Sequence, residues 1–304
     1  MTDKDLLPGS TVPRMTRRRL LGFTAGLVAC AWLGNEVTRG SLVKAAEDVH
    51  WDYYSHGGGD GWGELTEEGS DEPAFPHCNL IEQSPVNIPL DAPLSGGLSV
   101  DYHPARLAVL NNGHTIQVNY EPGSTMTVDG KTYNLRQFHF HTPSEHEIDG
   151  DQTALEAHFV HQAKDGEYAV LGVMIVPGNA NAAFQAVLDV MPHEEGEEET
   201  DDQIDGAHLL PGDLSFWAYD GSFTTPPCTE GVKWHVLYEP ITVSLQQVAA
   251  FRSLPFLSHE GEFVGNARPV QPLNGRLGAT APDGFDMPAI TPPSTGNAGL
   301  ATRR

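Results

Sequence analysis

Basic residues are scarce in this sequence. Its 304 residues include 17 lysines and arginines against 41 aspartates and glutamates, which gives a formal net charge of −24. Nucleic acids and anionic membrane surfaces bind proteins through basic patches, so neither is expected as a partner. A small neutral or anionic substrate would have to reach its site through local fields, against the charge of the whole molecule.

Long hydrophobic runs are also lacking. The apolar run Leu20–Leu33 is short for a membrane span, and it follows the twin-arginine pattern TRRRLLG at residues 16–22. With a small-residue cleavage site at Val43-Lys44-Ala45, residues 1–45 are predicted to be a twin-arginine signal peptide. We therefore expect a protein exported to the periplasm or the cell exterior by the Tat route. The alternative, an uncleaved N-terminal anchor helix, is disfavoured by the flanking arginines.

Only three cysteines are present. Cys30 lies in the apolar run, where LVAC (residues 27–30) resembles a lipobox; lipidation of Cys30 would be the route to a membrane. The run continues past Cys30, which favours an ordinary residue of a signal peptide. Cys78 and Cys228 are expected to pair in an oxidising compartment. Closing so long a loop, about 150 residues, would contribute about 4–5 kcal/mol of stability in the chain-entropy model.

Helical periodicity is confined to two short segments, 181–190 and 244–251. Strand-like runs separated by turn signals recur instead, and the Asp129-Gly130 pair between two of them indicates a hairpin. The pattern predicts a mainly β (α+β) domain around one large, mostly antiparallel twisted sheet with a few short helices. The predicted strands are 107–110, 114–120, 125–128, 133–141, 154–161, 168–176, 233–238 and 241–243.

Two segments outside these runs carry no predicted element. Residues 193–205 are strongly acidic and are expected to form a solvated loop, because a run of like charges usually stays extended in water. Residues 281–304 are rich in Pro, Gly, Ser and Thr and are predicted to be a disordered tail. The predicted domain therefore covers residues 46–280.

The stretch QFHFHTPSEH (137–146) crowds metal-capable groups together. On a strand, residues two apart share a face, so His139 and His141 point one way while Phe138 and Phe140 point into a core. His158, on the run 154–161, would complete a three-histidine site if that run pairs alongside. Such a site leaves one zinc coordination position open for water, which is typical of catalytic zinc.

Histidine ligands need hydrogen-bond acceptors that fix the ring tautomer. Gln137 and Glu156 each lie two residues from a predicted ligand and share its face, which suits them for this role. Single strand histidines are more often packing residues, and one H-x-H pair is a weak signal. The third histidine and the nearby carboxylates of Glu145 and Glu156 strengthen the metal interpretation.

The chain resembles an α-class carbonic anhydrase of the exported bacterial type over about residues 50–275. The resemblance rests on separate blocks in the family's order: HW (50–51), QSPVNI (83–88), NNGH (111–114), QFHFH (137–141), SEH (144–146), EAHFVH (156–161), GSFTTPPC (221–228) and NARP (266–269). It implies a zinc enzyme that hydrates carbon dioxide reversibly to bicarbonate and a proton, by attack of zinc-bound hydroxide.

The resemblance also assigns residues. It implies Zn²⁺ on His139, His141 and His158, with the backbone carbonyl of Asn266 as the acceptor for His141. Thr224 would orient the nucleophile while hydrogen-bonded to an ionised Glu145. It further implies the bridge between Cys78 and Cys228.

Substrate and proton would take separate paths in this interpretation. An apolar wall for carbon dioxide is implied at Val160, Val170, Val232 and Trp234, which from the residues alone fit ordinary core equally well. Phe223 and Thr225 would border this pocket, and Phe223 departs from the family's usual leucine. His114 would shuttle the proton, and the residues that would hold its relay waters are Tyr53, Asn111 and Asn112.

Two other functions fit part of the pattern. A catalytically silent binding domain of the same family would lack a zinc histidine, whereas all three are present here. A cupin-like metal oxygenase would use H-x-H with Glu145 as a further ligand, but the glycines of that motif are misplaced. A homodimer is the assembly that the resemblance suggests.

Overall fold

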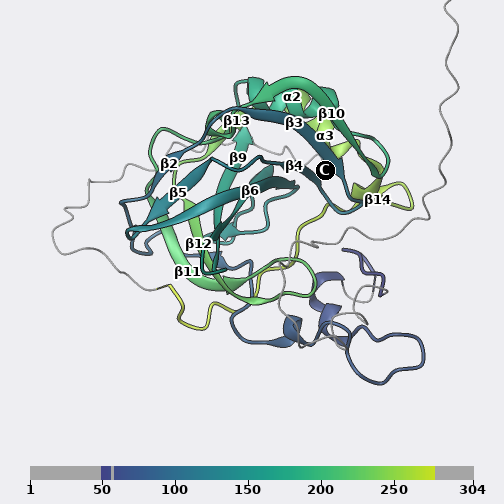
Figure 1. The fold of residues 1–304 in the computed structure, drawn as a ribbon. Helices are drawn as coiled ribbons and strands as arrows, with labels where there is room; N and C mark the ends of the chain where they lie inside the picture. Colours follow the sequence, from purple (N-terminus) through teal and green to yellow (C-terminus); the bar gives the residue numbers. More distant parts are fainter. Residues whose placement is uncertain (1–48, 56–57, 278–304) are drawn as a thin grey trace, which may run out of the picture. The chain divides into compact units, whose positions relative to one another are not determined.

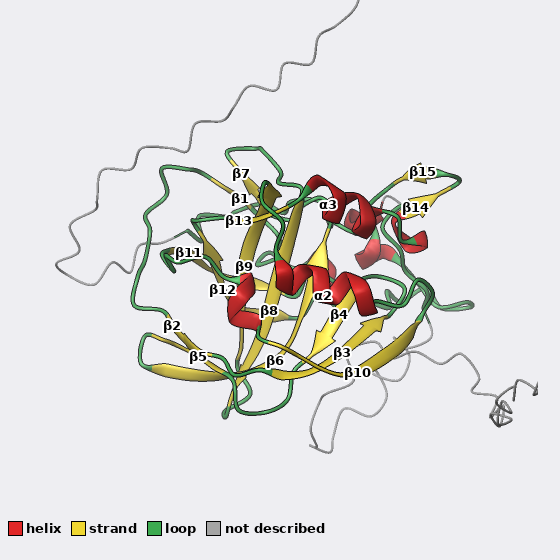
Figure 2. Ribbon diagram, turned by 90° about the horizontal axis from the view of Figure 1, so that it is seen from above, coloured by secondary structure: helices red, strands yellow, loops and turns green. Residues whose placement is uncertain are grey.

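The computed structural model describes residues 49–55 and 58–277. These residues form an 11-stranded sheet with two short α-helices, so the predicted mainly β fold is confirmed (Figures 1 and 2). The predicted signal peptide 1–45, with Cys30, and the predicted tail 281–304 lie outside the described residues. None of the described helices is long and apolar enough to cross a membrane.

The large sheet has the strand order β10-β3-β4-β6-β8-β9-β12-β11, with β5 joining β6 to β2 and β13 pairing with β9. Its pairs are antiparallel except that β12 and β13 run parallel to β9. The bounds of its strands are β2 (Ser99–Asp101), β3 (Ala105–Asn111), β4 (Ile116–Asn119), β5 (Thr125–Val128), β6 (Lys131–His141), β8 (Leu155–Ala163), β9 (Tyr168–Pro177), β10 (Gly196–Ile204), β11 (Phe216–Ser222), β12 (Glu230–Leu237) and β13 (Ile241–Val243).

Smaller elements surround this sheet. Two-stranded pairs are formed by β1 (Asn87–Ile88) with β7 (Glu147–Ile148) and by β14 (Ser258–His259) with β15 (Glu262–Phe263). The α-helices are α2 (Ala182–Val190) and α3 (Leu245–Arg252). Single 3₁₀ turns are η1 (Gly58–Asp60), η2 (Trp62–Glu64), η3 (Pro76–Asn79), η4 (Gly206–Leu209) and η5 (Pro255–Leu257).

Local sequence signals explain several of these elements. Asp129 and Gly130 both adopt positive φ (51° and 74°) between β5 and β6, so the predicted hairpin is confirmed. Asn181 caps α2 by accepting from the amides of Ala183 and Phe184. Ser244 and Gln247 form a capping box that starts α3. Both helices therefore begin where the sequence predicted.

The prediction of a solvated loop at residues 193–205 was wrong. Gly196–Ile204 form β10, which pairs antiparallel with β3 at the edge of the sheet. The acidic side chains are exposed, since only Ile204 of the strand is buried. The open hydrogen-bonding edge of β3 supplies backbone partners, while the charges stay in water. The strand β11 (FWAYDGS) was also missed, and it pairs with β12.

The two faces of the sheet bury different sets of apolar side chains. On one face, Phe138 and Phe140 belong to the main cluster, and Phe140 packs against both helices: its ring centroid lies 5.0 Å from that of Phe184 on α2 and 5.9 Å from that of Phe251 on α3. Figure 2 shows these two helices over the sheet. On the other face a second buried cluster contains Val160, Val170, Val232 and Trp234. The histidine-rich face of β6 is therefore separated from the main core.

Candidate metal centre

The three predicted ligands converge because of strand register. On β6, His139 and His141 share a face, and on β8 the Cα of His158 lies opposite that of His139. The ring centroids lie 5.1 Å apart for His139–His141, 5.3 Å for His139–His158 and 4.6 Å for His141–His158. One ligand nitrogen from each ring lies within 4.8 Å of the others. The structure thus brings together the triad predicted from the sequence.

Each imidazole is oriented by a different acceptor. Nδ1 of His139 lies 2.8 Å from Oε1 of Gln137, and Nδ1 of His141 lies 2.7 Å from the carbonyl oxygen of Asn266. Nε2 of His158 lies 2.8 Å from Oε1 of Glu156. Each of the three predicted partners thus occupies one nitrogen of its own histidine ring and leaves the other nitrogen for a metal ion.

The donor set fits zinc. Nε2 of His141 is buried and has no hydrogen-bond partner among the described residues, an arrangement that is costly unless a ligand satisfies it. Burial lowers the pKa of His139 well below its ordinary value, lowers that of His158, and lowers that of His141 to about 4. The imidazoles are therefore neutral near pH 7, which is the form that binds metal.

A buried network around Glu156 was not predicted from the sequence. Besides His158, the Glu156 carboxylate contacts Nδ1 of His146 at 2.7 Å and accepts from the amides of Glu145 and His146 at 2.9 Å. Nε2 of His146 lies 2.7 Å from the Tyr219 hydroxyl. Burial opposes ionisation of Glu156, but His146 and His158 hold its pKa well below the usual range. The motif SEH contained His146, but only the fold shows its partners.

Glu145 is fully buried beside the triad. Its Oε2 lies 3.4 Å from Nε2 of His141 and has no hydrogen-bond partner among the described residues, while Oε1 accepts from the amide of Arg268 at 2.9 Å. Burial raises the pKa of Glu145 to about 7, against the opposing effects of His158, Thr224 and the Arg268 amide. The predicted pair of Glu145 and Thr224 is therefore assembled, and Thr224 interacts with the carboxyl group.

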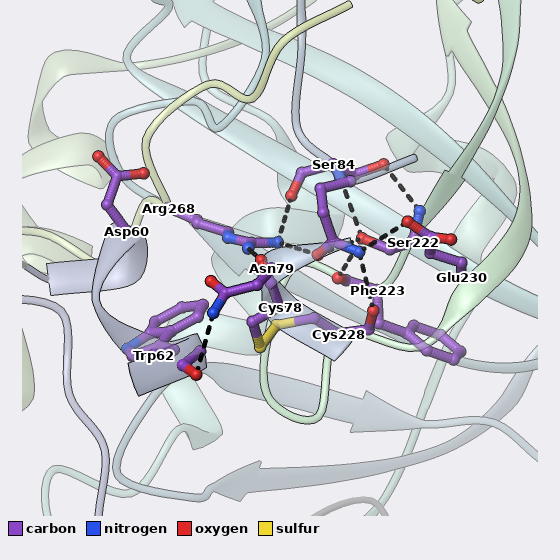
Figure 3. Close-up of a disulfide and its surroundings, with 12 residues drawn as sticks. Asp60, Trp62, Cys78, Asn79, Ser84, Ser222, Phe223, Cys228, Glu230 and Arg268 are labelled. Carbon is purple, nitrogen blue, oxygen red and sulfur yellow. Dashed lines mark hydrogen bonds between the residues drawn. A yellow bond between two sulfur atoms is a disulfide. The ribbon is translucent and has the colours of Figure 1, made fainter. Parts of the chain in front are cut away.

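A disulfide joins Cys78 to Cys228, as predicted (Figure 3). The carbonyl of Cys228 accepts from Nε2 of Gln83, and that of Cys78 accepts from Nη2 of Arg268. The Arg268 side chain is 1% exposed and also donates to Oε1 of Gln83. Because the backbone amide of Arg268 also holds Glu145, the bridge and the carboxylate share one buried network.

The predicted apolar wall lies next to His158. Val160, Val170, Val232 and Trp234 are each at most 6% exposed and belong to one cluster, and the Trp234 ring centroid lies 4.8 Å from that of His158. Phe223 is partly buried and packs against the same cluster. Thr225 is half-buried, and its carbonyl accepts from the amide of Cys228. An apolar surface thus borders the triad.

His114 lies on the turn between β3 and β4 and stacks on Trp51, with ring centroids 3.8 Å apart. Burial, reinforced by His50, lowers the pKa of His114 to about 4. The side chains of Asn111 and Asn112 hold this turn: their Oδ1 atoms accept from the amides of Gly113 and His114 respectively. The Tyr53 hydroxyl is buried without a partner among the described residues.

Asn266 connects the triad to this turn. Its carbonyl accepts from His141, and its Nδ2 donates to the carbonyl of His114 at 2.9 Å and to that of Phe140 at 3.0 Å. The NARP block (266–269) therefore fixes both a predicted ligand and the predicted shuttle, through one residue from a distant part of the chain.

Comparisons with known proteins place this arrangement in a family. Residues 67–277 match the model of the family described as "Eukaryotic-type carbonic anhydrase". The chain is 41% identical to a carbonic anhydrase of Neisseria gonorrhoeae over 274 residues, which cover 88% of this chain and 96% of the relative. It is 39% identical to a carbonic anhydrase of Pectobacterium carotovorum over 244 residues, covering 77% of this chain and 92% of the relative.

Solved structures agree with these matches. The α-carbonic anhydrase of Thermovibrio ammonificans, in complex with the inhibitor sulfanilamide, is 41% identical and superposes with a TM-score of 0.67. The alignment covers 75% of this chain and 97% of that protein. Sequence and fold comparisons thus point to the same relatives.

Proposed function

This chain belongs to the eukaryotic-type, or α-class, carbonic anhydrase family, and from that premise we propose that it hydrates carbon dioxide reversibly to bicarbonate and a proton. The observation that supports this best is the convergence of three oriented, neutral imidazoles beside an apolar wall. Family membership removes the cupin-like alternative, in which Glu145 would be a metal ligand.

His139, His141 and His158 would hold Zn²⁺. A zinc ion held there would lower the pKa of a coordinated water toward neutrality and so supply a hydroxide nucleophile, an effect best known from carbonic anhydrases themselves. Gln137, Asn266 and Glu156 keep the three rings in place.

Thr224 and Glu145 would orient the nucleophile. An ionised Glu145 would accept a hydrogen bond from the Thr224 hydroxyl, so that the threonine oxygen is left as an acceptor for the nucleophile. A cation on the neighbouring histidines would favour the ionised form of Glu145. The backbone N–H of Thr224 would donate to a substrate oxygen as charge develops on it.

The apolar wall would receive carbon dioxide. Val160, Val170, Val232 and Trp234 offer no hydrogen-bonding group at this surface other than the indole N–H, which donates to the carbonyl of Ser222. An uncharged substrate can displace solvent from such a surface, while charged bicarbonate is disfavoured there. The wall would thus favour binding of carbon dioxide and release of bicarbonate.

His114 would carry the proton away from the site. Its imidazole can accept and release a proton, which the apolar wall cannot. Tyr53, Asn111 and Asn112 are proposed to border the solvent path, and the asparagines also shape the turn.

The protein is proposed to act outside the cytoplasm. The Cys78–Cys228 disulfide supports an oxidising compartment. The twin-arginine signal and the alternative of a lipidated Cys30 remain predictions.

The test is stopped-flow carbon dioxide hydration with a pH indicator, before and after zinc removal and after zinc return. We expect fast hydration that disappears with the metal and is restored by zinc. His141→Ala should lose zinc and activity together, whereas Val160→Ala should keep zinc and lose catalytic efficiency. A folded, zinc-loaded protein without hydration would refute the proposal and leave a binding role.

A further inference from the structure

A cavity of about 310 Å³ is lined in part by His114, the predicted shuttle. Apart from His114, its lining histidines and carboxylates come from two distant segments: His50 and Asp52 from the N-terminal segment, and His193, Glu194 and Glu195 from the residues just before β10. The acidic run that folds as an edge strand therefore begins at the mouth of the proton path.

The position of Glu195 is fixed by the turn that carries His114. Gly113 has φ of +81°, and a Cβ built on it would lie 2.8 Å from Oε1 and 3.1 Å from Cδ of Glu195. Glu195 therefore occupies the space that a side chain at residue 113 would need. The absence of that side chain lets the carboxylate lie against the residue that precedes His114.

Two further contacts hold the acidic segment there. Nδ2 of Asn111 donates to the carbonyls of Pro192 and His193, at 2.9 and 3.3 Å. The Cα of Gly196 pairs with that of Asn111 in the register of β10 and β3. Residues 193–195 are thus held at the turn although their side chains are exposed.

The opposite wall also carries ionisable groups. Trp51 stacks on His114, and its neighbours His50 and Asp52 interact at 3.9 Å between Nε2 and Oδ2. His50 and Asp52 both affect the pKa of His114, in opposite directions. His114 thus shares one cavity with proton-accepting groups from both segments.

We propose that Glu195, supported by Glu194 and His193, is a second proton-transfer residue that takes the proton from His114 and releases it to solvent. This inference rests on the proposed hydration function. The N–H bond of the His114 imidazolium breaks and an O–H bond forms on Glu195, directly or through solvent in the cavity. That O–H bond then breaks as the proton passes to water or a buffer base, so both residues return to their starting states.

The electrostatics of the cavity favour this direction of transfer. Burial lowers the pKa of His114 to about 4, so its imidazolium gives up a proton readily. Carboxylates lining the cavity attract protons and can exchange them quickly with water, whereas anionic bicarbonate is repelled from them. Exposed side chains suit the last step, because solvent and buffer must reach them.

The test separates proton export from the chemistry at the metal. The variants are zinc-loaded Glu195→Gln and the double variant Glu194→Gln/Glu195→Gln. At low buffer concentration, kcat for hydration should fall in both, and roughly tenfold in the double variant. This loss is smaller than the 10²–10⁴ typical of a primary acid or base. The ratio kcat/KM should stay unchanged, since it does not include proton export. High concentrations of imidazole buffer should restore kcat.

The matched control is Glu198→Gln/Asp202→Asn. It removes two exposed charges from β10, the strand that directly follows Glu194 and Glu195, and neither residue lines the cavity. Its kcat at low buffer should equal that of the wild type, and all variants should keep the zinc content and unfolding midpoint of the wild type.

Three results would overturn the inference: unchanged kcat in both glutamine variants at low buffer, an equal loss in the control, or a parallel loss of kcat/KM. In all three the wild type still hydrates carbon dioxide with zinc, so the proposed function stands. A zinc-loaded wild type without hydration would instead refute both.

Discussion

The three candidate ligands are held by three chemically different acceptors: a side-chain amide, a backbone carbonyl and a carboxylate. Of these three accepting groups, the Glu156 carboxylate has the most partners, because it also contacts the His146 ring and accepts from two backbone amides. A carboxylate increases the electron-donating power of the imidazole that it binds. Residues that do not themselves bind the metal would thus tune its affinity.

Glu156→Gln is expected to weaken zinc binding by roughly 10- to 100-fold, the usual effect of losing such an outer partner. The neutral amide keeps the size of the side chain but removes the negative charge facing His158 and His146. Competition with a chromogenic chelator measures the affinity. Half-buried Glu147, on β7, offers a control as Glu147→Gln. Equal zinc affinity in wild type and Glu156→Gln would contradict the assigned role.

A second residue-scale prediction concerns His235, on the face of the sheet opposite the triad. Burial lowers its pKa to about 4, and its Nδ1 has no hydrogen-bond partner among the described residues. An unfolded chain, where histidine titrates near about 6.5, binds more protons than the folded one between these pH values. Neutral His235 therefore stabilises the folded state fully above about pH 6.5, and this stabilisation is lost as the pH falls toward 4.

His235→Phe keeps a ring against Phe216 and cannot be protonated. Between pH 7 and 4 the wild type should lose up to roughly 3 kcal/mol more unfolding free energy than this variant. Urea unfolding at a series of pH values gives the comparison, and contributions common to both proteins, such as metal loss, cancel. Exposed His103 serves as the control, as His103→Gln. Parallel pH curves would show that His235 contributes nothing.

At the scale of elements, the register of β6 and β8 makes the site. A shift of one residue would turn His158 to the opposite face and bring Ala157 or Phe159 opposite His139. The alternate face of β8 resists such a shift, because Phe159 would leave the main core and lose its packing against Phe138. Packing of one face therefore fixes the metal geometry on the other.

The disulfide joins two further elements, η3 and the loop after β11. Cys78 and Cys228 are 150 residues apart, so loss of the bridge should lower stability by about 4–5 kcal/mol in the chain-entropy model. Reduction should also increase amide hydrogen exchange at Thr224, Thr225 and Cys228; Pro226 and Pro227 between them have no amide hydrogen. Thermal midpoints with and without reductant, and for Cys78→Ala/Cys228→Ala, test the prediction. Equal midpoints in all samples would refute it.

At the scale of the whole molecule, acidic charge dominates. The net charge of −24 favours solubility but makes the folded chain repel itself. β10 places five carboxylates at an edge of the large sheet, where they oppose pairing with another chain. Homodimer formation through another surface stays a prediction.

Salt should therefore stabilise the protein. Raising sodium chloride to about 1 M shortens the screening length to about 3 Å, which weakens repulsion among exposed carboxylates. The thermal midpoint should rise from its value in dilute buffer, and the rise should shrink in a variant with several exposed acidic residues of β10 made neutral. Chloride is preferred to sulfate, because sulfate strengthens apolar burial by itself. A midpoint independent of salt would show that repulsion among the exposed carboxylates does not limit stability.

Much of the structure was predictable where local signals agree. Alternation in residues 137–141 indicates a strand with two histidines on one face, and Asp129-Gly130 and the caps of α2 and α3 mark their turns and ends. β10 was missed because its carboxylates and glycine argue against a strand, and pairing with β3 overrides that local preference. β11 (FWAYDGS), which pairs with β12, was missed although its aromatic residues favour a strand.

The sequence by itself determined which chemistry is available: histidines on one face of a strand, carboxylates nearby and a family resemblance in ordered blocks. Only the tertiary structure decided that His158 meets the β6 pair, that Asn266 joins His141 to His114, and that Glu195 lies against Gly113. These contacts link residues far apart in the chain. They depend on strand register and packing of the whole sheet, which no local pattern encodes.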